Sequence, residues 1–368
     1  MRILVMGGTQ FNGLSLVHEL HRSGHDVAVC NRGRSTADLP TDVERLVADR
    51  TDHQALGAAL NGRDWDAVVD MSAYHPPDVE SMIGLLDGRC GHYVFASSTV
   101  IYAASDTLPI TEDHPDERGP DQNEYGLHKL QCEDLLLAAH AERGFPATTV
   151  PFSMVFGPHN TLRDREQRMF ARMLAGRPVL IPGDGMTLLQ IGHVDDQSRA
   201  IAAMLGHEIT HGRRYNLTGA QAVTRSGYVR LVAEALGVPD RSVSIPADLM
   251  DELWRGDRTV GDGRTDVAMN IRSSAKASTN PRADLLRRRF QLAQLVQHLA
   301  PNIHWWNRST VFSIDRLRSD IGWEPDHDIA SMIAHTWDWF ERSGLAAGGD
   351  TIDWSFEDRI LELVGPDA

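Results

Sequence analysis

The feature that most constrains the fold is a glycine turn that follows the first apolar run of the chain. Ile3 to Met6 forms that run, and Gly7 and Gly13 lie in the stretch directly after it. A continuous short apolar run is typical of a strand buried on both faces. Apolar residues at helical spacing come next and end at Gly24, which is a common helix-terminating residue. This order predicts a strand–turn–helix unit of a parallel sheet.

The same alternation continues through the first 150 residues. Helical segments separate further short apolar runs, which we interpret as strands at 27–30, 46–48, 67–69, 93–96 and 147–152. Strands alternating with helices imply a parallel sheet covered on both faces, so we predict an α/β protein with a doubly wound sheet of the Rossmann type. After Pro151 the rhythm changes, and glycine and proline turns separate shorter elements. Helical periodicity returns over 329–340.

Composition excludes several classes of protein. Apolar content of 42% and charged content of 24% are ordinary for a globular protein. A net charge of −15 repels phosphate backbones, so we expect no nucleic-acid partner. The three cysteines show no metal-type spacing and suit a reducing compartment. No apolar stretch approaches the ~20 residues of a membrane span. With no room for a signal peptide before the glycine turn, we expect a cytoplasmic protein without a membrane partner.

The glycine turn has the form of a dinucleotide-binding site. Gly7 suits the tight turn, and Gly13 suits close packing of helix on strand. The helix N-terminus near Phe11 presents unpaired N–H groups to a pyrophosphate. Gln10 replaces the usual middle glycine, which shifts the cofactor or adds an amide contact. The alternative is a tight turn that binds nothing. Expected cofactor contacts in this stretch are Gly7, Thr9, Gln10, Phe11, Asn12 and Gly13.

The end of the second predicted strand indicates which cofactor is bound. NAD-selective folds place a carboxylate there for the ribose hydroxyls. This chain instead has Asn31, Arg32 and Arg34, and guanidinium groups suit a 2′-phosphate. The sequence therefore favours NADP over NAD. Asp49, after the third strand, is placed to bond the adenine amino group.

A tyrosine and a lysine one helical turn apart supply the candidate chemistry. Tyr125 and Lys129 stand at i and i+4 and so share one helix face. The lysine charge favours the phenolate and lowers a pKa that is ordinarily about 10. The tyrosine then serves as general base toward a secondary alcohol. Ser98 ends the fifth strand, where it can hold the substrate oxygen. The alternative is a chance pair on a surface helix.

Together these residues resemble the extended short-chain dehydrogenase/reductase family, which includes sugar-nucleotide epimerases and dehydratases. The resemblance spans nearly the whole chain and includes the glycine turn, Ser97-Ser98-Thr99 before Tyr102, Tyr125/Lys129, Val155-Phe156-Gly157-Pro158, Pro182-Gly183-Asp184-Gly185, His193-Val194-Asp195-Asp196, Tyr215-Asn216-Leu217 and Leu317 to Pro325. It implies that Ser98, Tyr125 and Lys129 are catalytic and that the protein is a homodimer built on two helices per subunit.

The resemblance also implies a division into two domains. Residues 1–150, with returning segments at about 186–218, would form the NAD(P)-binding Rossmann domain. Residues 151–185 and 219–368 would form a smaller substrate-binding domain, with an insertion at about 256–305. Further expected cofactor contacts are Ser72, Pro151 and the catalytic Tyr125 and Lys129. The expected substrate contacts are Tyr74, His75, Thr99, Phe152, Ser153, His159 and Asn160, although loop-structural roles are an alternative for His75, His159 and Asn160.

Two departures from the family pattern narrow the predicted function. The chain is most similar to an atypical branch that includes chloroplast stem-loop RNA-binding proteins and bacterial epimerase-like proteins. Sugar-nucleotide enzymes commonly carry a diphosphate-gripping arginine four residues before His193, where this chain has Leu189. That difference weakens a sugar-nucleotide assignment, although a nearby arginine is a possible substitute: Arg163, Arg165 or Arg168.

The residues after Ser98 narrow the predicted reaction. The 4,6-dehydratases carry an Asp-Glu pair after the catalytic Ser/Thr, and related decarboxylases usually carry a glutamate there. This chain has Thr99 and Val100. We therefore predict an NAD(P)-dependent epimerase acting on a secondary hydroxyl of a sugar, nucleoside or sugar nucleotide through a transient keto intermediate.

Two alternatives stay open. One is an NADPH-dependent ketone or sugar reductase, and the other is an RNA-binding protein with a vestigial active site. Three histidines share the first predicted helix without metal-type spacing, so we expect no metal: His18, His21 and His25.

Overall fold

The N-terminal part of the chain forms a parallel sheet. The computed structural model describes residues 1–162, 165–258, 260, 306–345 and 352–365. In these residues the sheet contains β1 (Arg2–Met6), β2 (Asp26–Asn31), β3 (Glu44–Val47), β4 (Ala67–Asp70), β5 (Tyr93–Ser98), β6 (Ala147–Phe152) and β10 (Arg213–Arg214). Its strand order is β10-β6-β5-β4-β1-β2-β3, with every pair parallel. From β1 the chain adds β2 and β3 on one side and then β4, β5 and β6 on the other, so the topological switch point lies between β1 and β4. Open α/β sheets bind their ligands at this point.

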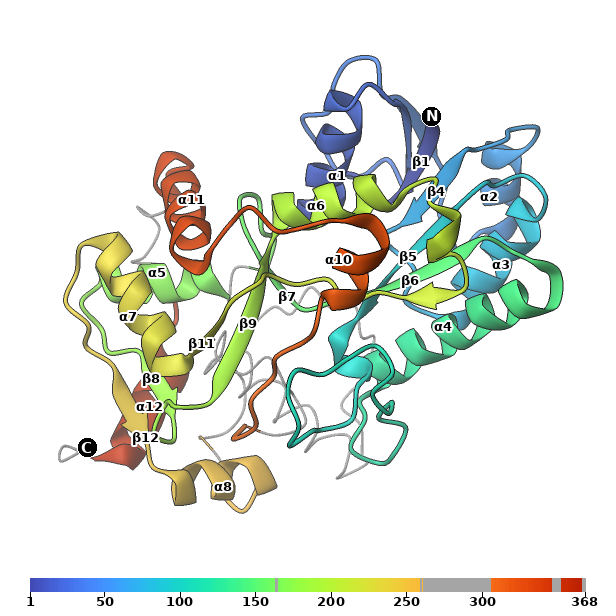
Figure 1. Cartoon of the computed structure of the whole chain (residues 1–368). Coiled ribbons are helices and arrows are strands. Elements are labelled where there is room, and N and C mark those ends of the chain that lie inside the picture. Colours follow the sequence, from blue (N-terminus) through green and yellow to red (C-terminus); the bar gives the residue numbers. More distant parts are fainter. Residues whose placement is uncertain (163–164, 259, 261–305, 346–351, 366–368) are drawn as a thin grey trace.

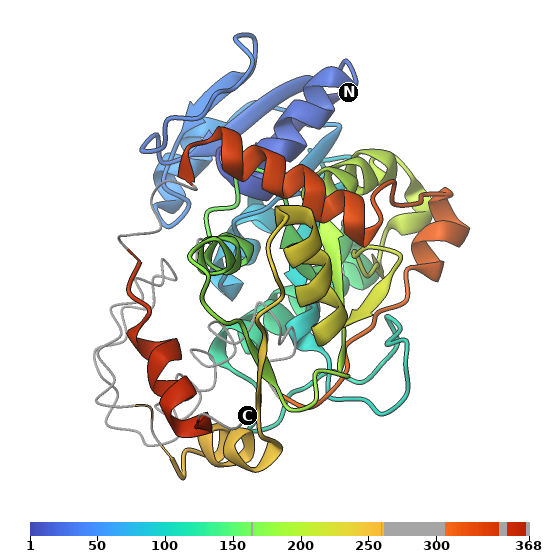
Figure 2. The same ribbon diagram turned by 90° about the vertical axis from the view of Figure 1, so that its left-hand side faces the viewer.

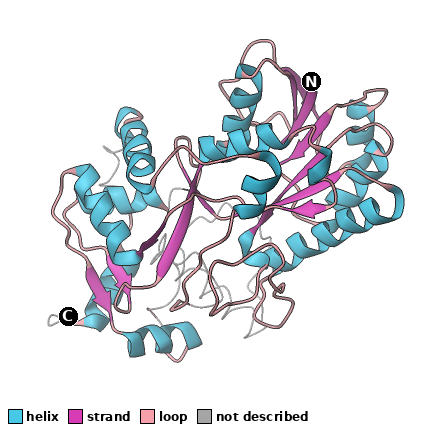
Figure 3. Cartoon of the chain, in the orientation of Figure 1, coloured by secondary structure: helices cyan, strands magenta, loops and turns pink. Residues whose placement is uncertain are grey.

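Helices cover both faces of this sheet, as Figure 3 shows. They are α1 (Phe11–Arg22), α2 (His53–Leu60), α3 (Pro76–Leu86), α4 (Glu124–Arg143) and α6 (Val194–Met204). Alternate residues of β1 enter two different cores, as the strand period of two requires. Ile3 and Val5 pack with α1 and α6, whereas Leu4 and Met6 pack with α2, α3 and α4. The predicted doubly wound α/β fold is confirmed.

The C-terminal part is built around smaller sheets (Figure 1). One sheet has the order β11-β9-β7, and β8 pairs with β12. The strands are β7 (Met154–Phe156), β8 (Leu180–Pro182), β9 (Leu188–His193), β11 (Ala222–Thr224) and β12 (Val243–Ile245). The helices are α5 (Glu166–Leu174), α7 (Arg225–Leu236), α8 (Ala247–Arg255), α10 (Asp315–Ile321), α11 (Ile329–Arg342) and α12 (Ser355–Val364). Two short 3-10 helices complete the described elements: η1 (Thr99–Ile101) and η2 (Glu208–Thr210).

The chain passes between the two parts more than once. The strand β9 belongs to the smaller sheet, but α6, which follows it directly, packs on α1, and β10 then extends the large sheet. Figures 1 and 2 show α11 beside α7, on the side where α1 and α6 lie. Nearly all of the insertion predicted at about 256–305 lies outside the described residues. In the ranges that are described, no helix has the length and apolar character needed to cross a membrane.

Candidate active site at the carboxyl edge of the large sheet

The glycine turn lies at the point where the strand order reverses. Gly7 has φ +89°, and a Cβ added there would lie 2.8 Å from Ser72 Cβ. A Cβ on Gly13 would lie 2.7 Å from the carbonyl oxygen of Gly7. Both positions therefore require glycine. The α1 N-cap residue Gln10 makes no capping bond with its side chain, and the buried Oδ1 of Asn12 has no hydrogen-bond partner. This uncapped helix start fits the pyrophosphate of a dinucleotide.

A buried ion pair supports the same edge of the sheet. Arg50 Nη1 and Nη2 donate to the two carboxylate oxygens of Asp70 at 2.8 and 2.9 Å, and Nη1 also donates to Ser72 Oγ at 3.0 Å. Tyr93 donates its hydroxyl to Asp70 at 2.7 Å. Burial by itself would raise the pKa of Asp70, but the Arg50 charge and these bonds outweigh it and lower the pKa. The pair braces the turn that contains Ser72, which was expected to contact the cofactor.

The residues expected to select the cofactor lie together at the ends of β2 and β3. Arg32 and Arg34 are exposed, and both lower the pKa of Asp49, after the larger effect of hydrogen bonds from Thr51. Asn31 Oδ1 accepts a hydrogen bond from the backbone of Gly33 at 2.8 Å. The two guanidinium groups thus lie near the carboxylate proposed to reach the adenine.

The loop that carries the two arginines also reaches the glycine turn. Thr9 Oγ1 lies 2.7 Å from Ser35 Oγ. The residues expected to contact the adenine ribose and those expected to contact the phosphates are therefore neighbours.

Lys129 lies buried one turn after Tyr125 on α4. Asn123 caps this helix by accepting a hydrogen bond from the Gly126 N–H at 2.8 Å. Lys129 Nζ donates to the carbonyl oxygens of Ala73 and Ala96 at 2.8 and 2.6 Å. Burial lowers the pKa of Lys129 to about 8. The ammonium is therefore still mostly protonated at neutral pH, and its position is fixed by the ends of β4 and β5.

The side chains of Tyr125 and Ser98 lie close to one another. Burial is the main cause that raises the pKa of Tyr125, although 40% of the residue remains exposed. A hydrogen bond with Ser98 and the charge of Arg165 lower that pKa in part. The lowering of this pKa that was expected from Lys129 stays a prediction. The Lys129 Nζ lies 5.7 Å from the centroid of the Tyr125 ring.

Arg165 was considered from sequence only as a phosphate-binding substitute. Its guanidinium donates weakly to the carbonyl oxygen of Val155, at 3.5 Å. Burial lowers the pKa of Arg165, and the charges of Glu166 and Tyr125 act in the opposite direction. No local motif marks this residue, because Arg165 and Tyr125 are far apart in the sequence.

Two of the expected substrate residues lie beside Tyr125. The Tyr74 ring, 50% exposed, has its centroid 6.1 Å from that of Tyr125, and Lys129 Nζ lies 4.9 Å from the same ring. His75 is the N-cap of α3, and its Nδ1 lies 3.1 Å from Nδ1 of His128. His128, on α4, was not singled out from sequence. These aromatic rings form one wall of the candidate site.

Other expected residues have mainly structural partners. The Asn160 amide donates to both carboxylate oxygens of Glu166, at 2.8 and 3.1 Å. His159 has φ +63° and packs against Trp339 with ring centroids 5.3 Å apart. Both residues shape the loop between β7 and α5.

The remaining expected residues follow β5 and β6. Thr99 opens η1, directly after Ser98. Pro151 and Phe152 pair with Ser97 and Ser98 in the sheet register, and Phe152 is buried in the core with α1 and α6. Ser153 Oγ donates to Thr218 Oγ1 at 2.6 Å. Pro151 and Thr99 therefore flank Ser98 on the sheet edge, whereas Phe152 packs inward.

Comparison with known proteins identifies the family. Residues 3–218 match the model of the NAD dependent epimerase/dehydratase family, and the chain belongs to that family. It is thereby one of the extended short-chain dehydrogenase/reductase enzymes.

Among particular relatives, the chain is similar to the chloroplast stem-loop binding protein of 41 kDa b of Arabidopsis thaliana. The two are 31% identical over 255 residues, which cover 66% of this chain and 65% of that protein. It is also similar to the 2'-dehydrokanamycin reductase of Streptomyces kanamyceticus, with 28% identity over 251 residues, 67% of this chain and 70% of the reductase. The chain therefore spans about two thirds of the length of these relatives.

A solved structure supports the fold. The dTDP-glucose 4,6-dehydratase of Bacillus anthracis, determined in complex with NAD, superimposes with a TM-score of 0.69 at 18% identity. The match covers 94% of this chain and 97% of the dehydratase. The superposition thus extends over nearly the whole chain.

Proposed function

We propose that the protein is an NAD(P)-dependent epimerase that acts on a secondary hydroxyl of a sugar-type substrate through a transient ketone. The observation that carries this proposal is the contact between Ser98 and Tyr125 at the carboxyl end of β5, with the buried Lys129 one helical turn behind. Membership of the epimerase/dehydratase family supports it.

The proton and the substrate oxygen are handled by this chain's own side chains. Ser98 holds the substrate oxygen, and Tyr125 removes the hydroxyl proton as general base and returns it to the oxygen after reduction. The pKa of the phenol must fall for this step; burial raises it, whereas Ser98 and Arg165 act to lower it. A bound nicotinamide cofactor supplies the site that accepts and returns the hydride. Lys129 is proposed to hold the nicotinamide ribose at this edge.

The residues after Ser98 argue against dehydration. Loss of water from the sugar requires an acid that protonates the leaving hydroxyl. Thr99 and Val100 occupy the positions where dehydratases carry that acid, and neither can supply it at neutral pH. Oxidation followed by reduction of the same carbon needs no such acid. The site therefore favours epimerisation or a net redox reaction.

The proposed substrate class is a sugar, a nucleoside or a sugar nucleotide held without the usual arginine. Leu189 stands at that position on β9 and is fully buried in the core of the smaller sheet, so it offers no charge. Arg165 lies close enough to Tyr125 to affect its pKa. We propose that Arg165 supplies the positive charge on the substrate side of the site.

The cofactor is proposed to be NADP rather than NAD. Arg32 and Arg34 are exposed and lie near Asp49, at the strand end where the adenine ribose would be held. Two guanidinium groups at that position stabilise a 2′-phosphate better than a hydroxyl.

A net ketone reductase is the second candidate. It is favoured by the same two arginines and by the similarity to a reductase. Mass spectrometry of the purified protein and absorbance at 340 nm distinguish the two candidates. Tightly retained oxidised cofactor with no net absorbance change during turnover supports the epimerase. Stoichiometric loss of absorbance from added NADPH supports the reductase.

The similarity to a stem-loop binding protein raises RNA binding as a role from a different class. The net charge of −15 opposes association with a phosphate backbone. A filter-binding titration over a salt series, with and without cofactor, tests this role. Salt-sensitive RNA binding in a protein that binds no dinucleotide would replace the enzymatic proposal.

A further inference from the structure

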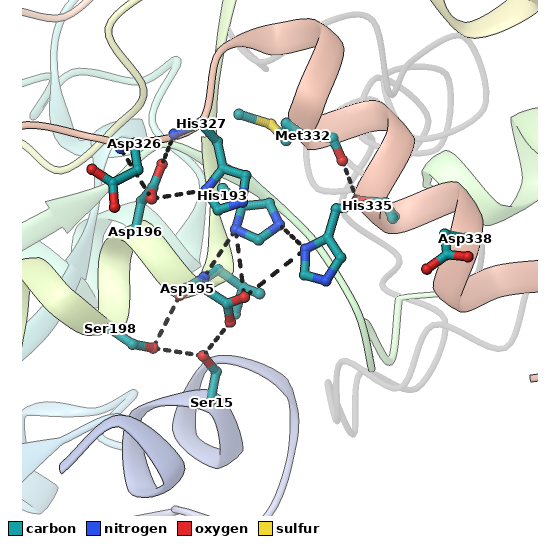
Figure 4. Close-up of polar contacts among 12 residues, drawn as sticks. Ser15, His193, Asp195, Asp196, Ser198, Asp326, His327, Met332, His335 and Asp338 are labelled. Atoms are coloured by element: carbon teal, nitrogen blue, oxygen red, sulfur yellow. Dashed lines mark hydrogen bonds and ion pairs between the residues drawn. The ribbon is translucent and has the colours of Figure 1, made fainter. Parts of the chain in front are cut away.

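A cluster of three histidines lies where β9 ends and α6 begins, beside α11 (Figure 4). His193 ends β9, His327 lies just before α11, and His335 is on α11 itself. His193 and His335 are 142 residues apart in the sequence, so no local spacing indicates the cluster. We propose that these three histidines bind one transition-metal dication of the zinc type.

The ring nitrogens are close enough for a shared ion. One nitrogen from each histidine lies within 4.8 Å of the others. His193 Nε2 and His335 Nδ1 are 3.1 Å apart. Zinc–imidazole bonds of about 2.0–2.1 Å in a tetrahedral site place neighbouring ligand atoms roughly 3.3 Å apart. The pair His193–His335 is therefore already at the ligand spacing of such a site.

Carboxylate groups lie next to the histidines, and carboxylates commonly hydrogen-bond the ring nitrogen of a metal-binding histidine that faces away from the ion. His327 Nδ1 lies 2.9 Å from Asp196 Oδ1, which leaves Nε2 of His327 available to an ion. The Asp196 side chain is 1% exposed and also accepts the backbone N–H of His327 at 3.1 Å. His327 is therefore held by a buried carboxylate through the nitrogen that does not bind the metal.

Asp195 provides the second carboxylate. Its Oδ2 lies 3.9 Å from Nδ1 of His193 and 3.9 Å from Nδ1 of His335. It therefore adds negative charge between two of the ligands and can complete the coordination. Ser15 of α1 donates to the other carboxylate oxygen of Asp195 at 2.9 Å. A bound ion would thus connect α11 to α6 and, through Asp195, to the helix that begins at the glycine turn.

Binding requires two of the rings to turn. The ring planes of His193 and His327 are stacked at 3.8 Å and 21°, and those of His327 and His335 are inclined by only 9°. Because a metal ion binds in the plane of each imidazole, nearly parallel rings do not yet converge on one point. The His335 side chain is 39% exposed and has room to rotate, whereas the His327 ring, 22% exposed, would turn about its bond to Asp196.

His193 stays in place but must change tautomer. Its Nδ1 accepts a hydrogen bond from the Asp195 backbone N–H at 3.2 Å, which puts the ring proton on Nε2. Coordination through Nε2 requires the ring proton to move to Nδ1, which gives up the hydrogen bond from the Asp195 N–H.

The donor set selects the kind of metal. Imidazole nitrogens suit Zn²⁺, Co²⁺, Ni²⁺ and Cu²⁺, whereas Mg²⁺ and Ca²⁺ prefer oxygen ligands. Three histidines and one carboxylate therefore predict strong binding of Zn²⁺ and Co²⁺ and no specific binding of Mg²⁺. This selectivity separates the site from a general attraction of cations to an acidic protein.

Calorimetric titration of the full chain, first stripped with a chelator, tests the proposal. We expect one Zn²⁺ per chain with a Kd below about 1 μM, no comparable Mg²⁺ signal, and a tetrahedral visible spectrum with Co²⁺. His335→Gln should weaken Zn²⁺ binding at least 100-fold, because one of three imidazoles is lost. The matched control is His21→Gln, which removes another histidine paired with an aspartate, 2.9 Å from Asp42, and should leave Zn²⁺ binding unchanged.

Circular dichroism establishes that both variants fold, and His327→Gln supplies an independent second variant. Absence of stoichiometric Zn²⁺ binding by the wild type would overturn the proposal. Equal affinity in the wild type, His335→Gln and His327→Gln would also overturn it, because the bound ion would then lie elsewhere.

Discussion

Lys129 Nζ lies 2.6 Å from the carbonyl oxygen of Ala96, on the strand that ends at Ser98. A second carbonyl oxygen, that of Ala73, lies 2.8 Å away. The ammonium is therefore held by uncharged acceptors at the ends of two neighbouring strands. Burial lowers its pKa to about 8, while the bonds to the carbonyls fix its position. This arrangement places a positive charge beside the candidate site before any ligand arrives.

Replacing Lys129 with Met should change the pH dependence of stability. The pKa falls from 10.5 in the unfolded chain to about 8 in the folded one, so the folded wild type binds fewer protons between these values. Wild-type stability relative to the variant should therefore rise from pH 8 to pH 10.5, by roughly 3 kcal/mol at most. Urea unfolding of both proteins across this pH range measures the difference. A difference that does not vary with pH would show that the pKa is not lowered.

The buried pair of Arg50 and Asp70 should be a major source of stability. Asp70→Asn removes the carboxylate that accepts from both Nη atoms and leaves only Asp78, 3.3 Å from Nε, as a charged partner of the guanidinium. The change should cost about 3–5 kcal/mol in the free energy of unfolding. The matched control is Asp64→Asn, because Asp64 pairs with Arg89 at the surface and its side chain is 85% exposed. That change should cost less than about 1 kcal/mol. Similar losses in both variants would contradict the assigned role of Asp70.

The close contact at Gly13 should limit cofactor binding. A Cβ at this position would lie 2.7 Å from the carbonyl oxygen of Gly7, so Gly13→Ala should displace the glycine turn from α1. We expect cofactor affinity to fall at least about 10-fold, measured by fluorescence titration. Gly84→Ala in α3 is the control, because nothing lies within 4 Å of its added Cβ. Unchanged cofactor affinity in Gly13→Ala would show that the glycine turn does not bind the cofactor.

Arg32 and Arg34 should determine the preference for a 2′-phosphate. Replacing either with Ala should raise the Kd for NADP roughly 10- to 100-fold, since a charge-assisted hydrogen bond contributes about 1.5–3 kcal/mol. The Kd for NAD should change little. Arg45→Ala removes a third arginine nearby, which bonds only weakly to the carbonyl of Ala37 at 3.3 Å, and should affect neither cofactor. Equal rises in the Kd for NADP and for NAD would show that the two arginines do not select between the cofactors.

Apolar spacing and turn residues in the sequence predicted the elements whose formation depends on neighbouring residues. The first strands, the glycine turn and α11 follow from apolar spacing and turn residues, and the structure confirms them. The proximity of Ser98 and Tyr125 could also be expected, because one ends a strand and the other begins the next long helix.

The interactions that the sequence did not reveal join distant segments. Arg50 follows β3 and Asp70 ends β4, two strands that β1 and β2 separate in the sheet. The pair therefore depends on the order of the strands, which sequence spacing does not indicate. The effect of Arg165 on Tyr125 likewise joins residues that are far apart in the sequence. The ammonium of Lys129 donates to two carbonyl oxygens, which the sequence did not indicate. Sequence spacing placed the two side chains on one helix face but could not specify which acceptors the ammonium meets.

The most direct test of the proposed chemistry compares the wild type with Tyr125→Phe. Both proteins, loaded with oxidised cofactor, are mixed with a panel of sugars, nucleosides and sugar nucleotides, and hydride transfer is followed at 340 nm in single turnover. We predict that at least one substrate class reduces the bound cofactor in the wild type. The rate in Tyr125→Phe should be lower by at least about 1,000-fold, with cofactor affinity unchanged. Equal rates in the two proteins, or no reaction of the wild type with any member of the panel, would contradict the proposed function.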